Sequence, residues 1–187
     1  EGPAGVLATG LGADGAGADL LTIPAGGSAM PPTAETLTAK AHFLRMDGRQ
    51  VFRFASRVVP QALHEVTRKA GLRVSQLDWV IPHQANLRII EAAAKRLDLP
   101  QERFYLDLER YGNTSAASVP IALCEAVAEG KVQPGQILVL VGFGAGLTWA
   151  AAALRWTLAP EGRGAPRLHN WLRRALYRWA GLRTRTS

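Results

Sequence analysis

Two short polar segments contain the side chains of this sequence that are best suited to chemistry. They are residues 82–86 (PHQAN) and 111–115 (YGNTS), whose reactive side chains, His83 and Asn113, stand thirty positions apart. Each segment has the composition of a strand end or tight turn and precedes an alanine-rich helix. A histidine and an asparagine presented in this way can jointly bind the oxygen of a thioester as negative charge develops on it. Because no candidate nucleophile accompanies them, the sequence predicts one half of an active site.

Both residues also have a structural interpretation. A single histidine is usually structural or exposed, but His83 follows an apolar strand, and open α/β sheets build their sites at the carboxyl ends of strands. A neutral imidazole there can donate one N–H to a substrate oxygen. Gly112 and Asn113 favour a turn on local grounds, with Thr114 or Ser115 capping the next helix. The two interpretations are compatible, because a tight turn aims an amide N–H₂ outward.

The other candidate groups give weaker signals. The glycine-rich segment 142–146 (GFGAG) lacks the lysine and Ser/Thr of a phosphate loop and precedes a strand, so we reject a nucleotide site there. Its functional use would be to offer a backbone N–H to a thioester oxygen. Cys124 falls in the middle of an expected helix with no obvious base, which favours a buried, inert thiol. His42, His64 and His169 show no metal-ligand spacing, and we predict no metal.

Composition and charge limit the classes of protein. The 187 residues are 48% hydrophobic, which is enough for a sizeable core, and no apolar run is long enough to span a membrane. The single cysteine excludes an internal disulfide and agrees with the cytoplasmic location that we expect. Residues 161–187 hold seven arginines and one glutamate, so nearly all of the +7 net charge belongs to this tail. Since the first residue is Glu1 and no secretory signal follows, we expect a truncated, processed or partial chain.

Hydrophobic periodicity predicts strands that alternate with helices, which argues for a layered α/β domain. The expected strands are Val6–Ala8, Leu20–Ile23, Leu77–Ile81, Arg103–Leu108, Ile137–Val141 and Leu147–Trp156. The expected helices are residues 49–70, 85–97 and 116–129. Pro60 should kink the first of these helices or mark a late start.

Four segments together resemble one known family. They are residues 46–52 (MDGRQVF), 78–90 (DWVIPHQANLRII), 111–118 (YGNTSAAS) and 142–149 (GFGAGLTW). In this order, within about residues 1–157, the sequence resembles the C-terminal half of β-ketoacyl-acyl carrier protein synthase III. That enzyme is the initiating condensing enzyme of type II fatty-acid synthesis and a member of the thiolase-like superfamily. The resemblance implies the C-terminal half of the superfamily's αβαβα layered fold.

The resemblance also implies a reaction and a role for three residues. In the family, a cysteine in the first half takes a short acyl group from coenzyme A. Malonyl-acyl carrier protein then loses carbon dioxide, and the resulting carbanion attacks the acyl-cysteine to give a 3-oxoacyl carrier protein. His83 and Asn113 would stabilise the enolate, which requires no base. The loop near Ala145, where many relatives have glycine, would contribute to the oxyanion hole.

Further family positions concern substrate binding. Gly48, Arg49, Phe52 and Asn86 match residues that line the pantetheine channel, with Arg49 in place of a common asparagine. Arg88 matches a basic residue implicated in docking the acidic carrier protein, and a solvated helix arginine is the alternative. The implied partners are acyl carrier protein, acyl-CoA and a second copy in a homodimer, with no cofactor and no nucleic acid.

Two departures from the family shape the expected organisation. The half that contains the nucleophilic cysteine is absent, so residues 1–157 would be incomplete as an enzyme and would expose an apolar face. Beyond them we expect a linker over residues 158–167 and a basic amphipathic helix over residues 168–187. This helix could lie on an anionic membrane, bind an acidic partner or pack on the protein itself.

Two other functions remain as alternatives. One is a type III-like condensing enzyme of polyketide or signal-molecule synthesis that has the same active site. The other is a non-catalytic thiolase-like binding or scaffold module. The presence of both His83 and Asn113, together with the residues that match the pantetheine channel, favours an enzyme.

Overall fold

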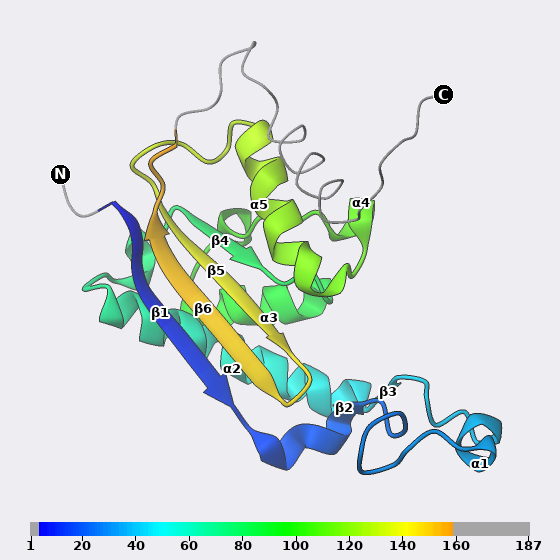
Figure 1. Cartoon of the computed structure of the whole chain (residues 1–187). Helices are drawn as coiled ribbons and strands as arrows, with labels where there is room; N and C mark the ends of the chain where they lie inside the picture. The colour runs from blue at the N-terminus through cyan, green and yellow to red at the C-terminus, as the bar shows by residue number, and fades with distance from the viewer. Residues whose placement is uncertain (1–3, 159–187) are drawn as a thin grey trace, which may run out of the picture.

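A mixed β-sheet forms the centre of the computed structural model, which describes residues 4–158. The sheet has four strands in the order β1-β6-β5-β4 (Figure 1). They are β1 (Gly5–Ala13), β4 (Trp79–Pro82), β5 (Ile137–Gly144) and β6 (Thr148–Arg155). β4 and β5 run parallel, whereas β6 is antiparallel to both β5 and β1. This sheet, together with the helices on it, confirms the predicted α/β class.

Helices cover both faces of this sheet. α2 (Gly48–Lys69) and α3 (Leu87–Leu97) pack on one face, and α5 (Ser118–Ala128) packs on the other (Figure 1). Because successive side chains of a strand point to opposite faces, Val80 of β4 packs with the α2–α3 layer and Ile81 packs with α5. Both side chains are fully buried. Burial on two faces explains why the central strands are unbroken aliphatic runs.

The remaining elements are short. α4 (Leu108–Tyr111) precedes α5, and the segment between β1 and α2 leaves the sheet (Figure 1). That segment contains α1 (Ala34–Thr38) and a two-stranded ribbon of β2 (Leu21–Thr22) and β3 (Arg45–Met46). The 3₁₀ helices are Gly15–Leu20, Val74–Gln76, Gln101–Arg103 and Ser115–Ala117. No helix within residues 4–158 is long and apolar enough to cross a membrane.

The prediction of a strand over Arg103–Leu108 is wrong. Phe104 makes only a single parallel bridge with Val80, between a 3₁₀ helix and α4. The backbone groups that would continue a ladder are taken by a side chain instead. The amide of Gln84 donates to Tyr105 O at 3.0 Å, and its oxygen accepts from Asp107 N at 3.2 Å.

Pro60 lies inside α2, which runs unbroken from Gly48 to Lys69, so the predicted late start is wrong. A proline cannot donate to the carbonyl four residues earlier, which here is Ser56 O. Arg96 of α3 supplies the missing donor, because its Nη1 lies 2.8 Å from that oxygen. A contact from the neighbouring helix therefore compensates for the proline.

The remaining predictions differ mainly at their ends. The predicted helix over residues 85–97 begins at Leu87, and the one over residues 116–129 begins as a 3₁₀ turn before α5. The predicted strand Leu20–Ile23 is reduced to β2, which lies outside the main sheet. Apart from Leu158, the predicted linker and basic helix fall outside the residues that the structure describes.

Candidate active site

The parallel pairing of β4 with β5 brings two of the predicted site segments to one end of the sheet. His83 directly follows β4, and its backbone N–H donates to Val141 O of β5 at 2.8 Å. Its ring also contacts Phe143, with the ring centroids 5.3 Å apart and an interplanar angle of 75°. The histidine therefore lies beside the end of β5, close to the glycine-rich segment.

The imidazole of His83 is half-buried and is held by a side chain from α5. Its Nδ1 atom lies 2.5 Å from the hydroxyl oxygen of Ser118, the first residue of that helix. Burial lowers the pKa of His83 below its ordinary value of 6.5, because an apolar setting penalises the charged form. The ring is therefore neutral near pH 7.

Gln84 fixes the turn that carries His83. Its side chain is fully buried, and the amide nitrogen donates to Pro82 O at 2.9 Å and to Tyr105 O at 3.0 Å. Its side-chain oxygen accepts from Asp107 N at 3.2 Å. The turn after β4 is thereby joined to the segment that leads into α4. Sequence reasoning assigned Gln84 no role, although a polar residue two positions after a buried strand is a signal that could have identified it.

Asn113 lies in an exposed turn between α4 and α5. Its side-chain oxygen accepts the backbone N–H of Ser115 at 3.0 Å, so the Nδ2 amide group is left to donate outward. Gly112 has a φ of 65° and ψ of −158°, a conformation that favours glycine. The prediction that Thr114 or Ser115 caps the next helix is wrong, because neither side chain makes a capping hydrogen bond. The side chain of Asn113 instead accepts the hydrogen bond from the backbone of this turn.

Polar contacts tie the end of α4 to α5. Arg110 pairs with Glu125 at 3.0 Å and with Glu129 at 2.9 Å, and it also donates to the hydroxyl of Tyr105 at 2.9 Å. Tyr111 donates to the other carboxylate oxygen of Glu125 at 3.0 Å. Partly exposed ion pairs contribute little energy individually. Their effect here is to hold the residues before Asn113 against α5. The first residue of α5, Ser118, contacts His83.

The glycine-rich segment is only partly a loop. Residues 142–144 continue β5 and pair with β6, so the turn is limited to the residues around Ala145 and Gly146. Ala145 is exposed, and its carbonyl accepts the hydroxyl of Thr148 at 2.9 Å. The predicted strand Ile137–Val141 therefore extends to Gly144, because glycine also tolerates an extended conformation.

The expected channel residues occur at the starts of two helices. Gly48, Arg49 and Phe52 lie in the first turns of α2, which begins near β3 at the end of the sheet toward which β1 and β5 run (Figure 1). Asn86 caps α3, because its side-chain oxygen accepts the backbone N–H of Arg88 at 2.9 Å. Arg88 is exposed in the first turn of that helix.

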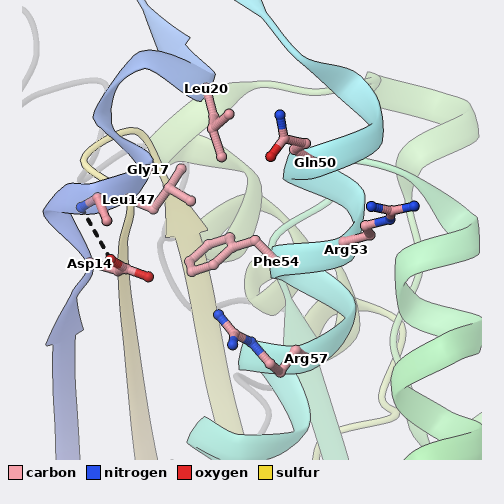
Figure 2. A pocket seen from close by; sticks show the side chains of 9 residues that line it. Asp14, Gly17, Leu20, Gln50, Arg53, Phe54, Arg57 and Leu147 are labelled. Atoms are coloured by element: carbon pink, nitrogen blue, oxygen red, sulfur yellow. Dashed lines mark hydrogen bonds between the residues drawn. The ribbon is translucent and has the colours of Figure 1, made fainter.

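A cavity of about 370 Å³ lies at the same end of the sheet. Figure 2 shows side chains of α2 on one side of it and, on the other, Leu147 together with Asp14, Gly17 and Leu20 from the segment that follows β1. Its lining includes Phe54, Arg57 and Leu147, but neither His83 nor Asn113. Leu147 lies just after the turn that contains Ala145, so the cavity adjoins the expected oxyanion loop.

Other reactive groups do not form a second centre in this part of the molecule. Cys124 is half-buried in α5, and burial raises the pKa of its thiol, which disfavours the nucleophilic thiolate. Within residues 4–158, no three His, Cys, Asp or Glu side chains gather as metal ligands.

Comparisons with known proteins agree with this arrangement. Residues 67–156 match the family described as 3-oxoacyl-[acyl-carrier-protein (ACP)] synthase III C terminal. The β-ketoacyl-[acyl-carrier-protein] synthase III of Symbiobacterium thermophilum is 52% identical over 152 residues, which are 81% of this chain and 46% of that protein. The crystal structure of the synthase III from Thermus thermophilus is 46% identical, with a TM-score of 0.73 over 83% of this chain and 47% of that one.

A polyketide enzyme is also similar. The priming β-ketosynthase from the R1128 polyketide biosynthetic pathway is 35% identical, with a TM-score of 0.71 over 85% of this chain and 46% of that chain. The chain therefore spans about half the length of the relatives that it matches.

The fold and the two polar segments define the C-terminal half of a thiolase-like condensing fold. Within that class, the chain belongs to the β-ketoacyl-acyl carrier protein synthase III family and corresponds to its C-terminal half. The family predicted from four sequence segments is thus confirmed.

Proposed function

We propose that this chain supplies the enolate-stabilising half of a 3-oxoacyl-acyl carrier protein synthase III. The whole enzyme would condense a short acyl group from acyl-CoA with malonyl-acyl carrier protein and so initiate fatty-acid synthesis. The observation that carries the proposal is that His83 and Asn113 each have one side-chain polar atom held by the protein and a second one without such a partner among the described residues. Nδ1 of His83 contacts the hydroxyl of Ser118, and burial lowers the pKa of this imidazole, while the side-chain oxygen of Asn113 accepts from Ser115. Nε2 of His83 and the Nδ2 amide group of Asn113 are therefore the groups left for a substrate oxygen.

These two donors suit a decarboxylative condensation. When the bond between the malonyl α-carbon and its carboxylate breaks, carbon dioxide leaves and the electron pair moves into the thioester as an enolate. Hydrogen bonds from His83 and Asn113 stabilise the negative oxygen without removing a proton. The enolate carbon then attacks the acyl-cysteine of the other half of the fold, and the cysteine leaves as a thiolate. The backbone near Ala145 serves the oxyanion of that second step.

The remaining assignments belong to the same proposal. Gly48, Arg49, Phe52 and Asn86 line the channel for the pantetheine arm, and Arg88 docks the acidic carrier protein. Their support is the family resemblance and their location at helix starts. A homodimer, a cytoplasmic location and a reaction without a bound cofactor follow from the same resemblance.

A condensing enzyme of polyketide synthesis is the second candidate. The observation in its favour is the 35% identity to the R1128 priming β-ketosynthase. Both reactions use the same enolate chemistry, so His83 and Asn113 keep their roles in either case. Assays of acyl-CoA primers and of carrier proteins from the two pathways in the source organism separate the candidates, since the preferred pair identifies the pathway.

The decisive test is His83→Ala in the full polypeptide in which this sequence occurs, or in this chain together with its cysteine-bearing half. Loss of one preorganised donor to a developing oxyanion typically costs about 10²- to 10³-fold in rate. We expect a loss of this size in release of carbon dioxide from malonyl-acyl carrier protein. His64→Ala, at an exposed position of α2, is the matched control and should leave the rate unchanged. Normal decarboxylation by the His83 variant contradicts the assigned role.

The basic tail gives a separate proposal that rests on its sequence alone. We expect that residues 168–187 bind anionic membrane surfaces through an arginine-rich amphipathic helix. Deletion of residues 161–187 should reduce co-sedimentation with vesicles that contain anionic lipid and leave condensation in solution intact. Equal vesicle binding with and without the tail would exclude this role.

A further inference from the structure

The hydroxyl of Ser118 contacts both residues of the turn after β4. Its oxygen lies 2.5 Å from Nδ1 of His83 and 3.3 Å from the backbone nitrogen of Gln84. Ser118 is 2% exposed, so water does not supply alternative partners freely. The serine belongs to a helix that is 34 or more residues distant in the sequence from these partners. Its contact with the histidine is therefore a feature of the tertiary structure.

Counting hydrogens at this oxygen determines the direction of each bond. The N–H of Gln84 can only donate, so Ser118 Oγ accepts there. The hydroxyl has one hydrogen of its own, and Oγ has no third partner among the described residues. If Nδ1 of His83 were protonated, that hydroxyl hydrogen would be buried without an acceptor, which is costly. The hydroxyl hydrogen of Ser118 has an acceptor only when Nδ1 of His83 is unprotonated, so the hydroxyl donates to Nδ1.

An unprotonated Nδ1 places the single proton of the neutral ring on Nε2. We propose that Ser118 is a positioning residue that holds His83 in the Nε2–H tautomer and directs this N–H to the substrate oxygen. This inference rests on the proposed function for the identity of the substrate, but the tautomer itself does not depend on it. The contact with Phe143 adds a packing partner that restricts the orientation of the ring, while Ser118 sets its tautomer.

The test has a spectroscopic part that needs no substrate. The full polypeptide is labelled with ¹⁵N-histidine, and the ring signals are recorded above the titration range of the imidazole. His83→Gln identifies the signals of His83 among the histidines. We expect a protonated Nε2 and an unprotonated Nδ1 in the unchanged protein, and a mixture of tautomers in Ser118→Ala. A protonated Nδ1 in the unchanged protein, or an unaltered tautomer in Ser118→Ala, overturns the proposal.

The kinetic part uses the same variants. Loss of one hydrogen bond worth about 1.4 kcal/mol corresponds to a tenfold change. We therefore expect Ser118→Ala to lower kcat for malonyl decarboxylation about tenfold with KM unchanged, and Ser118→Thr, which keeps the hydroxyl, to restore it. Ser56→Ala is the matched control, because Ser56 is a buried serine of α2 whose hydroxyl makes no hydrogen bond among the described residues.

The two parts separate this inference from the proposed function. An Nε2–H tautomer that is lost in Ser118→Ala supports the role of Ser118 even if the unchanged protein shows no decarboxylation, and that result counts against the proposed function alone. An active protein whose kcat and tautomer are both insensitive to Ser118→Ala counts against the positioning role alone.

Discussion

The two polar segments at the proposed active site are held in different ways. His83 is fixed by residues distant in the sequence, because its backbone bonds to Val141 and its ring contacts Ser118 and Phe143. Asn113 is fixed by its own turn, through a bond to the backbone of Ser115. The histidine is half-buried and the asparagine is exposed.

If both side chains donate to one substrate oxygen, as we propose, this difference has a physical reason. An imidazole has two tautomers and a pKa near neutrality, so it needs burial and a defined partner before its N–H is reliable. A primary amide has no such tautomers and does not titrate near neutral pH. A local turn that binds its oxygen is therefore sufficient to orient its N–H₂ group. Substitutions at a distance should therefore disturb the histidine more than the asparagine.

The largest effect that tests this comparison is on stability, at Gln84. Gln84→Leu removes the donor to Pro82 O and Tyr105 O and the acceptor for Asp107 N, all of which are buried groups. Each unsatisfied buried group costs about 1–3 kcal/mol, and partial relaxation should leave a net loss of about 3 kcal/mol in the free energy of unfolding. Urea unfolding of the full polypeptide measures it.

The matched control is Gln61→Leu, at an exposed position of α2. It should change the free energy of unfolding by no more than about 0.5 kcal/mol. If the two variants were equally stable, the turn after β4 would not depend on Gln84, and the contrast between the segments would rest on the contacts of His83 with Val141, Ser118 and Phe143 alone.

The residues involved show what the sequence could and could not predict. His83 and Asn113 could be proposed as site residues because their signals are local: an apolar strand before the histidine, a Gly-Asn turn, and a family motif around each. Buried strands such as Ile137–Val141 were recognised from composition for the same reason. Periodicity and turn chemistry act over a few residues, and the sequence displays them directly.

Contacts between distant segments could not be predicted in the same way. The false strand at residues 103–108 arose because its apolar side chains resemble a strand, while its backbone is bonded by Gln84 from another segment. Pro60 was expected to disturb α2, but Arg96 of α3 supplies a donor to the carbonyl concerned. Ser118 was part of a recognised motif, yet its partner His83 is 35 residues away. Each case depends on tertiary packing that overrides the local pattern.

The next effect concerns the asparagine, where activity and stability should separate. Asn113→Asp keeps an oxygen that accepts from the backbone of Ser115, but it replaces the donating N–H₂ group with a charged oxygen. We expect decarboxylation of malonyl-acyl carrier protein to fall about 10²-fold, as for loss of an oxyanion donor. The free energy of unfolding should change by less than about 0.5 kcal/mol, because the turn is exposed. A stability loss as large as that of Gln84→Leu would show that Asn113 also has a structural role in the fold.

The smallest effect is the pH dependence of stability that His83 contributes. In the unfolded chain a histidine binds a proton near pH 6.5, whereas burial lowers the pKa of His83 in the folded protein. Between these two pKa values the unfolded state binds more protons, so the contribution of His83 to stability falls as the pH falls through about 6.5. Above about pH 7.5 both states are neutral at this residue, and the contribution is constant.

Asp107 contributes in the opposite sense, and a difference measurement removes it. Burial raises the pKa of Asp107, so its folded form keeps a proton to higher pH than the unfolded form, and its contribution to stability falls as the pH rises through that range. Subtracting the free energy of unfolding of His83→Gln from that of the unchanged protein, from about pH 5 to 8, isolates His83. The difference should rise with pH and then level off. A flat or falling difference would mean that His83 is not buried as a neutral ring, and the contrast with the exposed Asn113 would then rest on hydrogen bonding alone.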